Sequence, residues 1–286
     1  MRLTGKEYWQ SVYSDLLNNR VEADKANSSR NLLKKIIGKS ALDYWRRNAS
    51  RGYADYLLWD CIYKKYLPNS KGLKILEIGS APGNNLVRFN REFGFIPYGV
   101  EYTENGSELN RQAFIAGGIN PDNVVCADFF NEEFLNKYNN FFDIVISYGF
   151  IEHFDTPEQV INKHIGLLAN GGYLIVVIPN FSGLNYFFAK LFNPAILPLH
   201  NLKIMKKNIF CALFSDKTLT PLICNYYGMF SFDLFDSGKK GFSHFLLGIC
   251  KNIQCLVNLF LRIFFKDRPL ENGWFSPFMI YIGVKK

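Results

Sequence analysis

The sequence predicts an α/β fold in which helices cover both faces of a doubly wound, mostly parallel sheet. Between residues 71 and 180, short apolar runs alternate with stretches long enough to form helices. The runs are apolar throughout, which is typical of strands that are buried on both faces. A chain of 286 residues with 48% apolar residues can fill such a core, which excludes a wholly disordered or collagen-like protein.

The first region, residues 1–70, is predicted to form N-terminal helices. Thr4 and Glu7 have the spacing of a capping box, whose two side chains satisfy unpaired amides in the first turn of a helix. A second helix is expected over 53–67, because a turn cluster begins at Pro68. Three large side chains between these helices are expected to pack against them or to close over a ligand as a lid: Tyr44, Trp45 and Arg46.

The second region, residues 71–180, is predicted to be the ligand-binding core. Its expected strands are 73–78, 98–100, 123–126, 143–147 and 172–178. Helices are expected between them over 84–93, 107–116 and 157–168. This order of strands and helices is the one that builds a parallel sheet with helices on both faces.

The third region, residues 181–286, is aromatic and basic. Two further strands, 229–235 and 278–284, are expected to extend the sheet to seven strands at one edge. A helix between them, at about 244–265, is apolar apart from one narrow polar stripe. The stripe consists of His244, Lys251, Gln254 (or Asn252), Asn258 and Arg262.

Such a helix fits a core position, a cap over an active site, or a membrane interface. In the last case, cations in 239–268 would meet anionic headgroups. These cations are Lys239, Lys240, Lys266 and Arg268. The charge distribution agrees, because residues 190–286 carry 13 Lys and Arg against 5 Asp and Glu, which accounts for the net charge of +8. A membrane-spanning helix is not expected, because no run of about 18 residues lacks strongly polar ones.

The six cysteines contain no C-x-x-C pair, which argues against a zinc site or a disulfide framework. Reduced thiols in a cytoplasmic protein are therefore expected. The opening residues MRLTGKEYWQ also lack the apolar stretch of a secretory signal.

The strongest functional signal is the loop that follows the first strand. The segment 74–83 reads KILEIGSAPG, so an apolar strand ends in Glu77 and Gly79 and a turn of small residues leads to Gly83. Glycine permits a close approach of the backbone to a ligand, and the helix that follows begins with unpaired amides. Neither a phosphate-binding G-x-x-x-x-G-K-[ST] loop nor a G-x-G-x-x-G loop is present, which disfavours nucleotide hydrolases and dinucleotide oxidoreductases.

Two acidic residues add specificity at the ends of the next strands. Glu101 lies about 20 residues beyond the loop, where a carboxylate can accept hydrogen bonds from both hydroxyls of a ribose. Asp128 follows the third strand, where a carboxylate can accept from an adenine amino group while Phe129 packs on the ring. Each acid alone is as consistent with an ordinary solvated loop, but together they indicate a nucleoside site.

The sequence thus resembles class I S-adenosylmethionine-dependent methyltransferases over residues 70–180. The resemblance rests on segment 74–83, on Glu101 and Asp128, and on the segments 142–154 (FDIVISYGFIEHF) and 167–179 (LLANGGYLIVVIP). It is nearest to the small-molecule branch that contains ubiquinone-biosynthesis O-methyltransferases and sugar-modifying enzymes. The resemblance implies a Rossmann-like sheet and S-adenosylmethionine as the cofactor. The implied cofactor-binding residues are Glu77, Gly79, Ser80, Ala81, Gly83, Glu101, Tyr102, Asp128, Phe129, Ser147 and Tyr148.

Ala81 departs from the central glycine of the family's usual G-x-G-x-G loop. The resulting Ala-Pro-Gly resembles the loop of RNA methyltransferases, and the basic C-terminal third would suit a nucleic acid. Those enzymes close the fourth strand with a catalytic Asp, whereas this chain has Ser147 and Tyr148 there. Nucleic acid is therefore the less expected partner, and RNA methylation is kept as an alternative.

His153 is the candidate general base, because an imidazole titrates near neutral pH and this one follows a strand that ends at the ligand crevice. Glu152 would orient the imidazole. Equally, the pair can brace the adjoining helix. No metal is expected here, because the related quinone enzymes carry another carboxylate where this chain has Gly149.

These observations predict a cytoplasmic, possibly membrane-associated methyltransferase. The expected acceptor is a small molecule, a glycan or a lipid-linked compound, methylated at oxygen. A cofactor-binding, membrane-peripheral module without transfer activity remains the non-enzymatic alternative. The sequence contains no indication of the oligomeric state.

Overall fold

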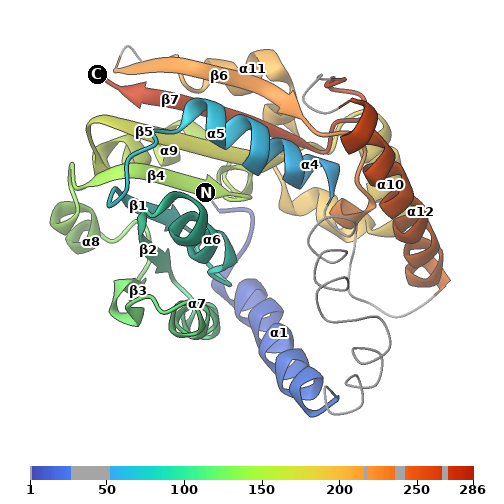
Figure 1. The fold of residues 1–286 in the computed structure, drawn as a ribbon, viewed down its shortest axis with the longest axis horizontal. Helices are drawn as coiled ribbons and strands as arrows, with labels where there is room; N and C mark the ends of the chain where they lie inside the picture. Colours follow the sequence, from blue (N-terminus) through green and yellow to red (C-terminus); the bar gives the residue numbers. More distant parts are fainter. Residues whose placement is uncertain (1, 27–51, 216–217, 236–241, 266–269) are drawn as a thin grey trace.

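The computed structural model describes residues 2–26, 52–215, 218–235, 242–265 and 270–286. They form an α/β structure around one seven-stranded sheet with the strand order β3-β2-β1-β4-β5-β7-β6 (Figure 1). The pairs among β1 to β5 are parallel, whereas β7 runs antiparallel to both of its neighbours, β5 and β6. The predicted fold class, a mostly parallel sheet of seven strands with helices around it, is confirmed.

The strands are short and apolar in the centre of the sheet. They are β1 (Lys74–Ile78), β2 (Ile96–Glu101), β3 (Val124–Cys126), β4 (Phe142–Tyr148), β5 (Leu168–Pro179), β6 (Leu219–Tyr227) and β7 (Phe278–Lys285). Successive side chains point to opposite faces, so neighbours such as Ile75 and Leu76 enter different cores. Both faces are therefore covered by helices.

The helices connect and flank these strands. They are α1 (Lys6–Ala26), α4 (Tyr53–Tyr56), α5 (Tyr63–Tyr66), α6 (Asn84–Phe93), α7 (Glu104–Ala116), α8 (Glu132–Lys137), α9 (Pro157–Leu167), α10 (Leu184–Phe192), α11 (Lys207–Ala212) and α12 (Phe242–Phe264). A π-helical turn, Leu57–Ile62, joins α4 to α5. Short 3₁₀ segments lie at Ile151–His153, Pro194–Leu199, Leu202–Met205 and Phe232–Phe235.

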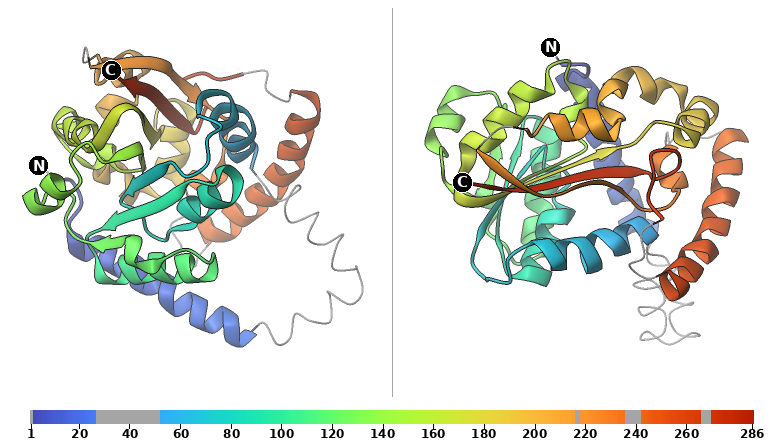
Figure 2. Two further views of the ribbon diagram at one scale, coloured as in Figure 1. Left: turned by 60° about the vertical axis from the view of Figure 1, so that its left-hand side comes forward. Right: turned by 90° about the horizontal axis from the view of Figure 1, so that it is seen from above.

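The two faces of the sheet carry different helices (Figure 2). The segment α4–α5 and helix α6 cover one face, where Trp59, Tyr63 and Phe89 pack together. Helices α9 and α11 cover the other face through Val160 and Phe210. Burial of these large side chains is the main stabilising contribution, roughly 1.5–3 kcal/mol for each.

The edge strand β6 differs from the sequence-based expectation. The predicted strand 229–235 is instead a loop and the 3₁₀ segment Phe232–Phe235, whose aromatic rings pack against Phe188 of α10. The strand lies earlier, at Leu219–Tyr227, and contains Pro221 at a shift in register. An edge strand tolerates proline and polar residues because only one side is paired. The aromatic residues of segment 229–235 pack in the core and do not form a strand.

The expectation of reduced thiols is wrong for two cysteines. Cys211 in α11 and Cys224 in β6 form a disulfide, with their Cα atoms 5.9 Å apart. Helix α11 packs on β6, which brings together cysteines 13 residues apart in the sequence. Sequence spacing alone does not reveal such a tertiary contact.

Several sequence-based expectations fall outside the described residues. They concern Tyr44, Trp45, Arg46, Lys239, Lys240, Lys266 and Arg268.

Candidate active site

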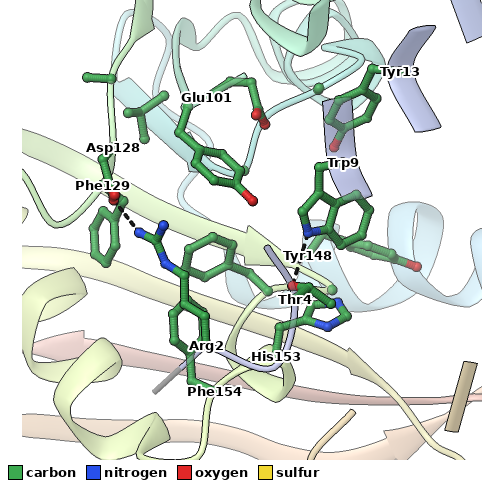
Figure 3. A pocket seen from close by; sticks show the side chains of 17 residues that line it. Arg2, Thr4, Trp9, Tyr13, Glu101, Asp128, Phe129, Tyr148, His153 and Phe154 are labelled. Carbon is green, nitrogen blue, oxygen red and sulfur yellow. Dashed lines mark hydrogen bonds and ion pairs between the residues drawn. The ribbon is translucent and has the colours of Figure 1, made fainter. Parts of the chain in front are cut away.

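A cavity of about 260 Å³ opens at the carboxyl ends of the central strands (Figure 3). This is where open α/β sheets bind ligands. Eight of the predicted site residues line the cavity together: Gly79, Ala81, Glu101, Tyr102, Asp128, Phe129, Tyr148 and His153. The sequence had placed these residues at the ends of four different strands, and the fold gathers them around one hollow.

The loop between β1 and α6 is shaped by two glycines with positive φ. Gly79 has φ +69°, and a Cβ atom there would lie 3.0 Å from the ring of Phe150. Gly83 has φ +87°, and a Cβ atom there would lie 2.3 Å from Oδ1 of Asn110. Both positions therefore require glycine, and the backbone at Gly79 lies open to the cavity.

Five predicted site residues lie behind the cavity wall instead of in it: Glu77, Ser80, Gly83, Ser147 and Glu152. The hydroxyl of Ser80 accepts a hydrogen bond from Nδ2 of Asn110, so its side chain serves to fasten the loop to α7. Ser147 is fully buried in β4. These residues position their neighbours and are not part of the lining.

Glu101 is 3% exposed, and its carboxylate is held at the cavity wall by Thr103. Oε1 accepts from the amide and the hydroxyl of Thr103, at 2.9 and 2.7 Å. Burial raises the pKa of this carboxyl, and the hydrogen bonds from Thr103 oppose that rise. A ligand that donates hydrogen bonds here would favour the ionised carboxylate.

Asp128 lies at the other end of the same wall and is partly exposed. Its Oδ1 accepts from the amide of Phe130 at 2.9 Å and also pairs with the guanidinium of Arg2. That guanidinium lies over the rings of Tyr102 and Phe130, at 5.2 and 5.0 Å from their centroids. The position expected to receive an adenine is thus flanked by flat side chains and a carboxylate.

The N-terminal segment forms part of the cavity wall, which the sequence reasoning missed. Its lining residues are Arg2, Thr4, Trp9 and Tyr13. The amide of Leu3 donates to the carbonyl of His153 at 2.7 Å, and the indole of Trp9 donates to the hydroxyl of Thr4 at 3.1 Å. The spacing of Trp9 and Tyr13, four residues apart after a capping box, was the available signal of a face that packs on the site.

Glu77 has a buried carboxylate whose Oε1 accepts from Nδ2 of Asn85 at 3.1 Å. Its Oε2 is buried and finds no hydrogen-bond partner in the described part of the chain. Burial raises the pKa of this carboxyl to about 8. A cationic ammonium group that reached Oε2 from the cavity side would satisfy it, so this oxygen behind the cavity wall is compatible with an amino-acid-bearing nucleoside such as S-adenosylmethionine.

His153 forms a buried pair with His200, a residue that the sequence reasoning missed. Nδ1 of His153 is 2.7 Å from the carbonyl of Leu199, and Nδ1 of His200 is 2.7 Å from that of Ile196. Because carbonyls only accept, each Nδ1 carries the proton and each Nε2 keeps a lone pair. Burial, assisted by His200, lowers the pKa of His153 to about 4, so this imidazole is neutral at pH 7.

Glu152 lies beside these imidazoles and is fully buried, and burial raises its pKa to about 8. One ligand atom from each of Glu152, His153 and His200 lies within 4.8 Å of the others. Within the described ranges, this group therefore has the donor types that can hold a divalent cation. In the absence of a cation, the neutral imidazoles can accept a proton from a substrate hydroxyl.

A second cavity of about 220 Å³ lies on the other side of Tyr148, which lines both cavities. The hydroxyls of Tyr148 and Tyr227 are 3.3 Å apart. The lining of the second cavity includes several polar residues, namely Asp55, Asn85, Ser231, Asp233, Gln254 and Asn258. The rest of its lining is mostly aromatic or apolar and includes Trp59, Met229 and Phe278, so this chamber offers polar groups set in a largely apolar wall.

Comparison with known proteins agrees with the predicted fold and enzyme class. A family model described as "Methyltransferase domain" matches residues 45–222. No curated protein sequence matches the chain.

Several solved structures share its fold. The structure of MccD protein superposes with a TM-score of 0.53 at 13% identity, over 82% of this chain and 96% of that chain. Geranyl diphosphate C-methyltransferase from Streptomyces coelicolor A3(2), solved with Mg²⁺, geranyl diphosphate and S-adenosyl-L-homocysteine, has a TM-score of 0.51 at 13% identity, over 79% and 77%. Geranyl diphosphate methyltransferase with GPP and sinefungin has a TM-score of 0.52 at 15% identity, over 82% and 76%.

The family model covers more than half of the chain, and the cavity gathers eight of the residues that the sequence predicted for the cofactor and for catalysis. The chain therefore belongs to the class I S-adenosylmethionine-dependent methyltransferases and is an enzyme.

Proposed function

We propose that this enzyme transfers the methyl group to an oxygen atom of a small-molecule, glycan or lipid-linked acceptor. The observation that carries the proposal is the neutral His153, which lines the cofactor cavity with Nδ1 held by a carbonyl. A hydroxyl acceptor loses a proton when it is methylated, and a positioned imidazole with a free lone pair is suited to accept it.

The residues along the cavity orient the cofactor. Asp128 and Phe129 suit the adenine, and Glu101 suits the ribose hydroxyls. Glu77 suits the ammonium group of the methionine part. When bound, S-adenosylmethionine supplies an electrophilic methyl group on a sulfonium centre. The Tyr148 and His153 end of the cavity then lies where that methyl group would be presented.

The chain contributes orientation, exclusion of water and proton removal. His153 accepts the acceptor's hydroxyl proton at Nε2 as the new carbon–oxygen bond forms and the carbon–sulfur bond breaks. The ring of His200 lies beside that of His153, with centroids 4.6 Å apart, and it lowers the pKa of His153, so the base stays neutral until the substrate proton arrives. Trp9 lies edge-on to His153 at 5.3 Å and shields this end from solvent.

The second cavity supports a polar acceptor. Its walls offer carboxylate, amide and hydroxyl groups, which suit a molecule rich in hydroxyls, such as a sugar. Tyr148 separates this chamber from the cofactor cavity, so an acceptor held there would need to present one hydroxyl past the phenol ring. A glycan head group meets both requirements.

The proposal is tested with S-adenosylmethionine labelled in the methyl group and cell-extract fractions separated into aqueous, nucleic-acid and organic-soluble pools. Label is expected in a glycan or lipid-linked product and should survive mild alkali, because a methyl ether is stable where a methyl ester is not. Nuclease-sensitive label would establish RNA methylation instead. No incorporation into any pool, despite tight cofactor binding, would show a module without transfer activity.

A further inference from the structure

Helix α12 carries its apolar side chains on the outside. Its exposed residues recur at spacings of three and four over the length of the helix, so they form one stripe. They are Phe245, Leu246, Ile249, Ile253, Leu256, Val257, Phe260, Ile263 and Phe264. Leu256 is 72% exposed and Phe245 64%, which are high values for such side chains.

The polar stripe of the same helix faces the protein. Gln254 and Asn258 are 9% and 7% exposed and line the second cavity. Oε1 of Gln254 accepts from the amide of Phe232 at 2.6 Å, and Lys251 pairs with Asp233 at 3.1 Å. A surface helix of a globular protein has the opposite orientation, with its apolar stripe toward the core. The inversion indicates that something apolar covers the outer stripe.

Neighbouring segments enlarge this apolar face. Helix α10 contacts α12 (Figure 1). Its residues Phe187 and Leu191 are 60% and 57% exposed. The carbonyl of Trp274, whose side chain is 62% exposed, accepts from the amide of Leu184 at the start of α10. We call the exposed apolar residues of α12, α10 and Trp274 the outer face.

The sheet topology excludes a transmembrane orientation. Among the described residues, His244–Phe264 is long and apolar enough to cross a bilayer by length and composition alone. However, β6 precedes α12 and β7 follows it, and these strands pair from Leu219 with Lys285 to Tyr227 with Phe278. A single crossing would place paired strands on opposite sides of the membrane. The helix must therefore begin and end on the same side.

The positive charge of the C-terminal third indicates that an anionic lipid surface covers the outer face. Residues 190–286, which contain α10, α12 and Trp274, carry eight more basic than acidic residues, 13 against 5. An exposed apolar stripe in so basic a part of the chain matches the interface of an anionic bilayer, in which acyl chains lie beneath negative headgroups.

We propose that the outer face docks on an anionic lipid bilayer, with α12 lying in the plane of the interface. The apolar stripe enters the acyl region, and the polar stripe stays on the protein and lines the second cavity. The docking itself does not depend on the identity of the methyl acceptor. It places the second cavity next to the headgroup layer, where a lipid-linked acceptor would be found.

The test is flotation of the full chain with vesicles of phosphatidylcholine containing 30 mol% phosphatidylglycerol, compared with vesicles of phosphatidylcholine alone. The chain should float with the anionic vesicles, and the triple variant Ile253→Glu, Leu256→Glu, Phe260→Glu should lose roughly tenfold or more of its binding. Ile115→Glu is the matched control, because Ile115 is 64% exposed on α7 and lies outside the outer face. This control variant should float like the unmodified chain.

Folding of each variant is checked by its affinity for S-adenosylhomocysteine, which the outer face does not contact. Equal flotation of the triple variant and the unmodified chain, or no flotation of either, would overturn the proposal. A dimer in light scattering that the triple variant converts to a monomer, without flotation of the unmodified chain, would assign the outer face to a second copy. Loss of methyl transfer with flotation retained would count against the proposed function and leave the docking intact.

Discussion

The guanidinium of Arg2 pairs with the carboxylate of Asp128 across 126 residues of sequence. This contact fastens the N-terminal segment over the adenine end of the cavity. The backbone amide of Leu3, bonded to the carbonyl of His153, fastens the same segment near the opposite end. The first residues of the chain thus bridge the proposed nucleoside end and the proposed reacting end of one cavity.

Replacing Arg2 tests this bridge. Arg2→Ala should weaken binding of S-adenosylhomocysteine about two- to fivefold in calorimetry, because a partly exposed ion pair contributes up to about 1 kcal/mol. Arg91→Ala is the control, since Arg91 also pairs with a carboxylate but lies on the outside of α6. An Arg2→Ala affinity equal to that of the control would show that the segment does not help to hold the cofactor.

The two acids should dominate cofactor affinity. Glu101→Ala and Asp128→Ala should each weaken S-adenosylhomocysteine binding roughly tenfold or more, because hydrogen bonds to charged groups contribute about 1.5–3 kcal/mol. Glu108→Ala, an exposed acid on the neighbouring α7, should bind like the unmodified protein. Unchanged affinity in both acid variants, measured by the same calorimetry, would remove the nucleoside assignment of this cavity.

His153 should affect kcat more than cofactor affinity. His153→Gln should lower kcat roughly 10²-fold or more, as expected for loss of a general base, with affinity for S-adenosylhomocysteine nearly unchanged. His244→Gln, an exposed histidine on α12, is the control. Because the pKa of His153 is about 4, its basic form persists from neutral pH down to about pH 5, and kcat should fall only as the pH approaches 4. A kcat that falls below pH 7 with a midpoint near 6.5 would contradict this environment.

Glu77 should make stability depend on pH. Its pKa is about 8 in the folded protein and 4.5 ordinarily, so between these values the folded state holds a proton that the unfolded state releases. The contribution of the protonated carboxyl is complete below pH 4.5 and is lost as the pH rises to 8. The Tm of Glu77→Gln should therefore rise relative to that of the unmodified protein over this window.

Scanning calorimetry at several pH values would measure this difference. Glu133→Gln, at an exposed site on α8, is the matched substitution. A Tm difference for Glu77→Gln that stays constant from pH 4.5 to 8 would show that the carboxyl is not buried as described.

The disulfide between Cys211 and Cys224 can be tested by counting the thiols that react before and after reduction. Alkylation under denaturing, non-reducing conditions should label four cysteines, namely Cys61, Cys126, Cys250 and Cys255, and reduction should release two more. Reduction should also lower Tm, because a bridge over a loop of this length contributes about 3 kcal/mol. The double variant Cys211→Ser, Cys224→Ser should show four thiols before and after reduction. Six thiols in the unmodified protein before reduction would contradict the bridge.

Much of the fold could be predicted because its signals are local. The five central strands are continuous apolar runs, and each run is followed by a helix with recognisable boundaries. The residues at their carboxyl ends, such as Gly79 and Glu101, follow from the same pattern, because parallel strands bring those ends to one edge. The sequence analysis predicted this strand at 229–235, because that segment is rich in aromatic residues. The true strand β6 lies at the sheet edge, where a strand needs no continuous apolar run.

The features that escaped prediction depend on tertiary contacts. Arg2 and His200 reach the site from segments far from the core motifs, and nothing in their local sequence marks that destination. The polar stripe of α12 was visible in the sequence, but periodicity reveals only that two faces differ. Which face turns toward the protein is decided by the partners of Gln254 and Lys251 in the 3₁₀ segment before the helix.

The position of β7 between β5 and β6 has a consequence for synthesis on the ribosome. The segments of β6 and α12 leave the exit tunnel before β7 does, yet β6 pairs with β7 alone. Until β7 emerges, the backbone groups of β6 have no strand to pair with, and the nascent sheet ends at β5. A truncation that removes β7 should therefore leave β5 as an open edge and β6 without a partner strand, which would expose the enzyme to chaperones or aggregation.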